Sequence, residues 1–188
     1  LITHEDPRNI LRELKFSKCY EIKIYSRLQL LLQFTIYLSN IDTDYCLLIQ
    51  PDGFVINPDK WDDDWFNYDY IGAPWSIAKD AYLDPWGKGH RVGNGGFSFR
   101  SKKLLDVPKH AYIHFDVNWG DFYKHMNVGF TSEDGIICVH NRHIYEALGC
   151  KIAPIEVAAR FSHERPLPET LGIKPFGFHY FLPEGTQL

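Results

Sequence analysis

The chain has 188 residues, a length typical of one domain, and 45% of them are apolar, enough to build a hydrophobic core. Its formal net charge is −4, so it lacks the excess of Lys and Arg that marks a nucleic-acid-binding surface. No apolar run approaches the roughly 20 residues of a membrane span, and no signal peptide is visible. We therefore expect a single domain over residues 1–188, with no nucleic-acid partner and no membrane span. The start at Leu1 rather than Met leaves open an N-terminal truncation.

Four cysteines occur, and no two of them form a Cys-x-x-Cys pair. Cys46 and Cys138 lie inside apolar runs, which predicts that they are small buried hydrophobic residues. This usage favours a reduced, cytoplasmic setting over a disulfide framework.

The first quarter of the chain predicts a strand, a helix and a second strand. After a short helix over residues 9–14, residues 20–24 alternate between apolar and polar, as a strand does. Residues 26–38 have apolar side chains near helical spacing, with Ser26 as the N-cap. A strand, a crossover helix and a strand form the unit of a parallel sheet.

The most informative strand covers residues 45–49, an apolar run that ends abruptly at Gln50, Pro51, Asp52 and Gly53. Such a run predicts a strand buried on both faces of a parallel sheet. Ligands bind beyond the carboxyl ends of strands in these sheets, so Asp52 lies where a catalytic or metal-binding carboxylate would lie. The alternative is that Asp52 only shapes the turn.

The middle of the chain predicts a helix start, an edge strand and a long loop. Carboxylates within residues 61–66 suit the N-terminus of a helix. Gly72 and Pro74 make residues 69–75 a poor central strand, so we expect an edge strand that enters a loop. Residues 76–91 contain few apolar side chains and predict a flexible, lid-like loop.

A glycine-rich segment follows, with Gly93, Gly95 and Gly96 close together before an alternating strand begins at Phe97. Glycines are tolerated where another backbone or a ligand must come close. The alternative is a bulge or a hairpin turn of the Asn-Gly type. No Gly-Lys-Ser/Thr follows, which excludes a P-loop.

The last third predicts two helices and two strands. A short helix covers residues 101–105, and a longer one begins at Thr131 or Ser132 and stops at Gly149. Strands are expected over residues 151–154 and 176–181, the second of which carries His179. Glu133 and Asp134 lie in the first turn of the longer helix, where the alternative role is pairing with the helix dipole.

Asp52, the Glu133–Asp134 pair, His179 and the glycines make a plausible active site. A carboxylate and an imidazole can hold manganese or magnesium against a diphosphate, and the metal neutralises the charge of the departing group. A second carboxylate can take the proton of an acceptor hydroxyl. This combination suits transfer from a phosphate-activated donor.

Six motifs in this order resemble those of a family of largely uncharacterised proteins assigned as glycosyltransferases. They are Ile-Asp-Thr-Asp-Tyr at 41–45, Gln-x-Asp-Gly-Phe at 50–54, Asp-Tyr-Ile-Gly-Ala-Pro-Trp at 69–75, Val-Gly-Asn-Gly-Gly-Phe-Ser at 92–98, Glu-Asp at 133–134 and Phe-Gly-Phe-His at 176–179. The third and fourth motifs are long enough to be specific. The resemblance covers roughly residues 41–180 and implies a compact GT-A fold, which is a single Rossmann-type α/β domain with a mixed, mostly parallel sheet flanked by helices.

The same resemblance implies roles for individual residues. Asp134 would be the base of an inverting transferase, with Glu133 supporting it or contacting the acceptor. Asp52 and His179 would hold Mn²⁺ or Mg²⁺. The partners would be a nucleotide-sugar donor and a glycan or other hydroxyl acceptor. The donor would bind at Gln50, Asp52, Gly53, Asn94, Gly95 and Gly96.

This sequence departs from the family pattern at one position that matters. GT-A enzymes carry Asp-x-Asp at the end of a central strand, whereas this chain has Gln50 in place of the first Asp, which weakens the expectation of strong metal dependence. Trp75 and Trp86 are candidates to stack on an acceptor sugar, or are core residues. Two other functions use the same residues: a metal-dependent phosphoester hydrolase, and a non-catalytic carbohydrate-binding module.

Overall fold

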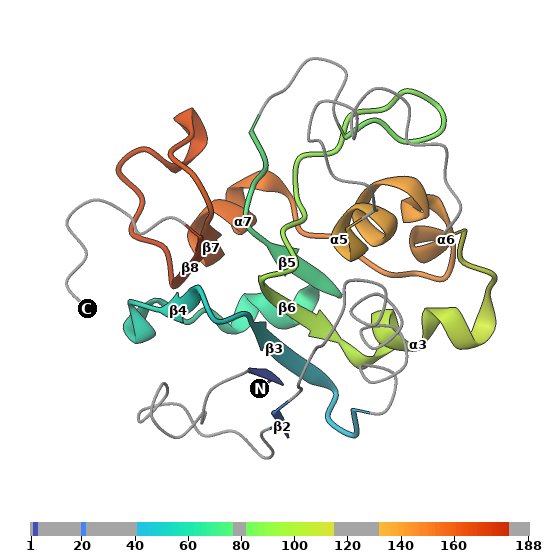
Figure 1. Cartoon of the computed structure of the whole chain (residues 1–188), viewed down its shortest axis with the longest axis horizontal. Helices are drawn as coiled ribbons and strands as arrows, with labels where there is room; N and C mark the ends of the chain where they lie inside the picture. Colours follow the sequence, from blue (N-terminus) through green and yellow to red (C-terminus); the bar gives the residue numbers. More distant parts are fainter. Residues whose placement is uncertain (1, 4–19, 22–40, 77–81, 115–131, 181–188) are drawn as a thin grey trace.

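The computed structural model describes residues 2–3, 20–21, 41–76, 82–114 and 132–180 (Figure 1). The helices expected over residues 9–14 and 26–38 lie outside these ranges, as do parts of the loops expected over 76–91 and 110–129. None of the helices in the described ranges is both long and apolar enough to cross a membrane.

A five-stranded sheet lies at the centre of the domain. Its strand order is β2-β1-β3-β6-β5, in which β2, β1 and β3 are parallel and β6 is antiparallel to both of its neighbours. The strands are β1 (Ile2–Thr3), β2 (Tyr20–Glu21), β3 (Tyr45–Ile49), β5 (Tyr70–Gly72) and β6 (Phe97–Ser101). The edge position of β5 confirms the strand expected there.

A separate three-stranded sheet has the order β4-β8-β7. Strand β8 (Gly177–His179) is antiparallel to β4 (Gly53–Val55) and parallel to β7 (Ser162–His163). The chain enters this second sheet directly after the turn that ends β3. Gln50, Pro51 and Asp52, which follow β3, therefore lie where the two sheets meet.

These two sheets correct the expected fold class. A single GT-A-like, Rossmann-type domain built on one mostly parallel sheet is wrong. Strand β6 pairs antiparallel along the whole of β3, from Tyr45 opposite Ser101 to Ile49 opposite Phe97. Antiparallel strands need no helical crossover between them. The glycine-rich segment can therefore lead directly into β6, which lies between β3 and β5.

Strand β3 is buried on both of its faces, as its apolar run predicted. Cys46 and Leu48 belong to one core cluster, and Leu47 and Ile49 belong to the other. Alternate side chains of a strand point to opposite faces, so this single strand contributes to both cores. The second cluster is rich in aromatic side chains, which include Trp65, Phe97, Phe99, Phe161 and Phe176.

The helices divide between the two sides of the five-stranded sheet (Figure 1). On one side lie α3 (Lys102–His110), α5 (Glu133–Gly135), a π-helical segment (Ile136–His140) and α6 (Arg142–Ala147). On the other lies α7 (Ile155–Phe161), next to the small sheet. Short 3₁₀ helices cover Pro58–Lys60, Asp63–Asn67 and Pro168–Thr170.

Several helix boundaries confirm the sequence prediction. Ser132 is the N-cap residue of α5, and Gly149, with a φ of 78°, follows the end of α6. The one helix expected over this range is interrupted by the π-helical segment. The expected short helix at 101–105 continues to His110, and the strand expected at 151–154 is reduced to one bridge between Ile152 and Tyr70.

Candidate functional site

The turn after β3 and the end of β8 bring Asp52 and His179 together. Gly53 pairs with His179 in the small sheet, which places the preceding Asp52 beside the imidazole. Asp52 Oδ1 and Gln50 Oε1 each lie 3.2 Å from His179 Nε2. Burial lowers the pKa of His179, while the charges of Asp52 and Asp134 oppose that shift. Residues about 130 positions apart thus form one polar group, as expected.

The glycine-rich segment packs directly against this histidine. A Cβ atom added to Gly96 would lie 2.1 Å from His179 Nε2, so any larger residue here would force the imidazole or the segment to move. Asn94 adopts a positive φ of 55°, and its Oδ1 accepts a hydrogen bond of 3.1 Å from the Gly96 N–H. The Gln50 N–H donates to the Gly96 carbonyl over 2.7 Å. The close approach that the glycines predicted is therefore made by an imidazole ring.

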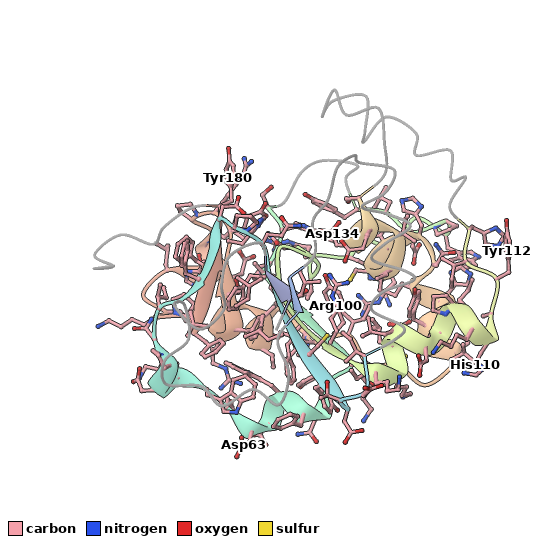
Figure 2. The ribbon with its side chains drawn as sticks, turned by 60° about the horizontal axis from the view of Figure 1, so that its bottom comes forward. Asp63, Arg100, His110, Tyr112, Asp134 and Tyr180 are labelled. Carbon is pink, nitrogen blue, oxygen red and sulfur yellow. The ribbon has the colours of Figure 1, made fainter. Side chains whose placement is uncertain are left out.

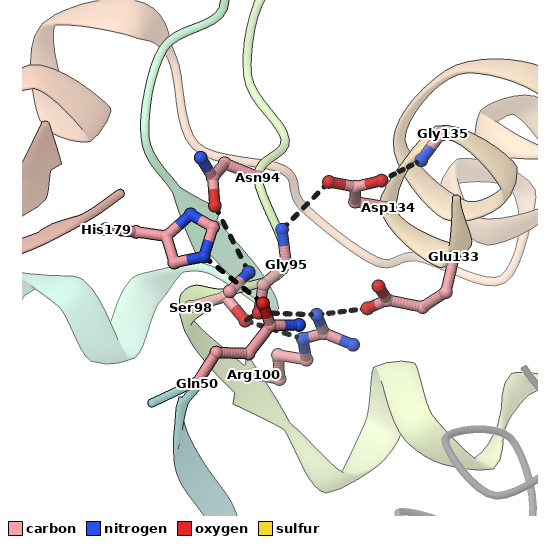
Figure 3. A network of polar contacts seen from close by, with 10 residues as sticks. Gln50, Asn94, Gly95, Ser98, Arg100, Glu133, Asp134, Gly135 and His179 are labelled. Carbon is pink, nitrogen blue, oxygen red and sulfur yellow. Dashed lines mark hydrogen bonds and ion pairs between the residues drawn. The ribbon is translucent and has the colours of Figure 1, made fainter. Parts of the chain in front are cut away.

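Asp134 ties the glycine-rich segment to the start of α5 (Figure 3). One carboxylate oxygen accepts a hydrogen bond of 2.9 Å from the Gly95 N–H, and the other accepts one of 2.8 Å from the Gly135 N–H. Such charge-assisted bonds are stronger than bonds between neutral groups. Asp134 therefore fixes the glycine-rich segment to the start of α5.

Glu133 points to the interior, where it forms an ion pair with Arg100. Arg100 is completely buried, and Figure 2 shows it among the interior side chains, whereas Tyr112 and Tyr180 lie at the periphery. Its Nε donates to Ser98 Oγ over 2.9 Å, and its Nη2 donates to the Gly95 carbonyl over 3.4 Å. The guanidinium thus holds the glycine-rich segment from the interior of the protein.

Glu133 and Arg100 each shift the pKa of the other. Burial raises the pKa of Glu133, and the adjacent Arg100 opposes this only in part, so the pKa lies above its ordinary value. Burial lowers the pKa of Arg100, but the Glu133 carboxylate opposes this shift, and the resulting pKa lies above its ordinary value. Because a guanidinium keeps its proton in proteins, the ionised carboxylate is its natural partner.

The comparisons with known proteins place these residues in a family. The chain matches, over residues 11–179, the family described as "Protein of unknown function (DUF5672)". The chain belongs to this family. The matched region runs from before β2 to His179, so it contains every candidate site residue of this DUF5672 member. Neither the search of the curated proteins nor that of the solved structures finds a match.

One acidic residue of this DUF5672 member was missed by the sequence analysis. Glu164 directly follows β7 and is half-buried; burial raises the pKa of its carboxyl, and the Asn94 side chain opposes this shift. Its electrostatic neighbours include Asp134 and Asp52. No motif pointed to it, because its place in the site depends on how β7 pairs with β8. The only available signal was a carboxylate at the end of a short apolar segment.

The remaining candidates have contrasting surroundings. A Cβ on Gly53 would lie 3.3 Å from the Phe178 carbonyl oxygen, so the turn is tightly packed. Trp75 is buried, and its ring stacks on Tyr82 with centroids 4.3 Å apart, which fits the core role that the sequence left open. Trp86 is 67% exposed and meets the His143 ring edge-on. Of these two aromatic residues, Trp86 presents the larger surface to a ligand.

The fit to a divalent metal is partial. Within residues 41–76, 82–114 and 132–180, no group of three or more His, Cys, Asp or Glu side chains could hold a metal ion. Asp52 and His179 can supply two ligands. Magnesium-type sites often use one or two protein carboxylates and take further ligands from substrate phosphates and water. Asp52 and His179 therefore fit a metal ion only if the substrate supplies further ligands to it.

Proposed function

We propose that this protein transfers a sugar from a nucleotide-sugar donor to a hydroxyl acceptor, with inversion at the anomeric carbon. One observation carries the proposal: His179 packs on Gly96 and pairs with Asp52, and Asp134 holds Gly95, so side chains from three distant parts of the sequence meet at the glycine-rich segment. An imidazole and two carboxylates are side chains that such a reaction requires. The fold supplies no argument here, because its sheets differ from those of the family that suggested the function.

In this proposal the donor lies along the turn and the glycine-rich segment, against Gln50, Asp52, Gly53, Asn94, Gly95 and Gly96. Asp52 and His179 would hold Mn²⁺ or Mg²⁺ together with the donor diphosphate. When bound, such an ion neutralises negative charge on the departing diphosphate.

The acceptor is a glycan or another molecule with a free hydroxyl. A carboxylate of the site receives the proton of that hydroxyl, and the family resemblance implied this role for Asp134, with Glu133 beside it. Glu133 would support the site through Arg100 rather than by contact with the acceptor, because the pair is buried. The exposed Trp86 is the better of the two tryptophans to stack on an acceptor sugar. The proposed location is the cytoplasm.

Calorimetry tests the donor half of the proposal. The purified chain is titrated with UDP-glucose, GDP-mannose, dTDP-glucose and CDP-glucose, each with and without manganese. We expect one nucleotide to bind, and manganese to strengthen its binding. Asp52→Asn should remove the metal-dependent part, whereas Asp59→Asn, an exposed residue paired with Lys60, should change nothing.

Two results would change the proposal. Binding that is the same with and without manganese keeps the transferase and removes the metal from it. A folded protein that binds none of the four nucleotide-sugars contradicts the transferase.

A further inference from the structure

Tyr180 adopts an unusual backbone conformation next to the candidate site. Its φ of 71° lies in the left-handed region, which is strained for a residue with a bulky side chain. Its N–H donates to the Asp52 carbonyl over 3.0 Å, directly after His179 in the chain, and the residue is 64% exposed. Strained residues of this kind cluster at ligand-binding and catalytic sites. We therefore expect the exposed Tyr180 ring to take part in binding.

The Tyr180 ring lies beneath the guanidinium of Arg165. The Arg165 Cζ atom lies over the ring, 5.6 Å from its centroid. Strand β7 runs parallel to β8 with His163 opposite Phe178, so the residues two positions further along, Arg165 and Tyr180, meet at the same edge of the small sheet. The hydrogen bond from Tyr180 to Asp52 joins this pair to the candidate site.

Arg165 also differs from the other arginines of the described ranges. Each of the others forms an ion pair with a carboxylate: Arg91, Arg100, Arg142 and Arg160. In the part of the chain that the structure describes, no carboxylate pairs with Arg165, which is exposed. A guanidinium presents its donors in a planar fork that matches a phosphate, and stacking on an aromatic face leaves the edge of that fork open. Arg165 can therefore bind an anion without giving up an ionic partner.

The candidate site has a use for such a cation. A diphosphate bound there brings its negative charge next to the Asp52 carboxylate. Asp52 and His179 offer two ligands to a metal ion, and the described residues form no group of three that could hold one. Phosphate groups in enzymes are commonly clamped by Arg or Lys together with a metal ion. A guanidinium at the edge of the sheet supplies positive charge that two metal ligands alone do not secure.

We infer that Arg165 binds the diphosphate of the nucleotide-sugar through its guanidinium, and that Tyr180 is a positioning residue that holds Arg165 in place. The inference rests on the proposed function for the identity of the ligand. A free nucleoside diphosphate and inorganic pyrophosphate contain the same pair of phosphates, so Arg165 binds them as well. Binding can therefore be measured without sugar transfer.

Calorimetry in the presence of EDTA, with inorganic pyrophosphate, UDP, GDP, dTDP and CDP as ligands, tests the role of Arg165. Arg165→Met should weaken the binding of pyrophosphate and of the preferred nucleoside diphosphate about tenfold to a hundredfold, the loss expected for hydrogen bonds to a charged group. Arg165→Lys should recover part of the affinity, because lysine keeps the charge but not the fork. Arg160→Met is the matched control, because Arg160 is also exposed but faces Asp62 at 3.7 Å, and it should bind as the unaltered protein does.

Tyr180→Gly tests the positioning role. Glycine accepts a positive φ without strain, so the backbone can keep its path while the ring is lost. Binding of pyrophosphate should weaken several-fold. The double variant Arg165→Met, Tyr180→Gly should bind no more weakly than Arg165→Met alone, because the ring acts only through the guanidinium. Losses that simply add in the double variant would overturn the positioning role.

The failures of the inference and of the proposed function are distinguishable. Unchanged affinity of Arg165→Met for pyrophosphate and the nucleoside diphosphates overturns the inference, and so does an unaltered protein that binds none of the five ligands. Release of nucleoside diphosphate by the unaltered protein, from a nucleotide-sugar and an acceptor sugar, tests the proposed function separately. Binding that is lost in Arg165→Met, together with no sugar transfer by the unaltered protein, supports the diphosphate site and contradicts the proposed function.

Discussion

The two sides of the glycine-rich segment use the same kinds of residues for different purposes. On the inner side, Arg100 and Glu133 form an ion pair from which water is excluded. On the outer side, Asp52 is about half exposed next to His179. A buried charge that loses its partner is costly, whereas a charge at a half-exposed edge can exchange its partner for a ligand. Burial, rather than residue type, therefore separates the supporting side from the side that can bind substrate.

The largest effect should come from breaking the inner side. Arg100→Met leaves Glu133 buried without its partner and should lower the free energy of unfolding by about 3–5 kcal/mol. Urea denaturation followed by circular dichroism measures the loss. The double variant Arg100→Met, Glu133→Gln should recover part of it, because no buried charge then remains.

A matched control for this variant is available on α6. Arg142 Nε lies 2.7 Å from Glu146 Oε1, and the Glu146 side chain is 46% exposed. Arg142→Met should cost only about 0.3–0.5 kcal/mol, as expected for such a helix pair. If Arg100→Met cost no more than Arg142→Met, the distinction between the two sides would be wrong.

Asp134→Asn tests the connection between the two sides. The two N–H groups of Gly95 and Gly135 are held by different oxygens of Asp134, and the variant replaces one of these oxygens by an NH2 group that cannot accept. The loss of one hydrogen bond to a charged group should cost about 1.5–3 kcal/mol of stability, measured by the same denaturation. Unchanged stability would mean that Asp134 does not hold the segment. Asp59→Asn, at an exposed surface pair, is the control.

Gly96→Ala tests the outer side. The new methyl group would collide with the His179 ring, so either the imidazole or the segment must move. Overpacking of this kind costs about 1–3 kcal/mol. The imidazole resonances of His179 in an NMR spectrum should also shift. Gly89→Ala is the control, because its added Cβ would meet nothing closer than Leu83 Cδ2 at 3.8 Å. Unshifted resonances in Gly96→Ala would contradict the packing.

The smallest effect is a dependence of stability on pH. Burial lowers the pKa of His140 to about 4, with Asp84 opposing, and burial also lowers the pKa of His179. The unfolded chain binds these protons more readily than the folded chain, so acid favours unfolding. Stability should be complete above about pH 6.5 and should fall as the pH drops toward about 4.

The midpoint of thermal unfolding, followed as a function of pH, measures this fall. His140→Gln should make the curve flatter, whereas His110→Gln, at an exposed position at the end of α3, should leave it unchanged. A midpoint that stays constant across this interval would show that the buried histidines are protonated without cost.

Local features of the sequence predicted local structure well. The apolar run at 45–49 became β3 with those bounds, because two-sided burial needs an unbroken series of apolar side chains. Ser132 and Gly149 bracket the helices between them, because caps act on neighbouring backbone groups. Cys46 and Cys138 are buried as expected.

Strand direction and strand partners were not predictable in this way. Residues 97–101 could pair with either direction of β3, and only the packing of the whole domain selects the antiparallel arrangement. The same holds for Arg100, which looks like an ordinary outward-facing residue of an alternating strand until Glu133 is brought to it.

The sequence by itself therefore determined that residues 45–49 form a strand buried on both faces, that Asp52 follows its end, and that helices begin at Ser132 and stop at Gly149. Those properties depend on residues within a few positions of each other. Only the tertiary structure decided that the described residues form two mixed sheets and that His179 packs on Gly96. Such contacts join residues far apart in the chain, and their energies depend on burial and geometry that no local pattern encodes.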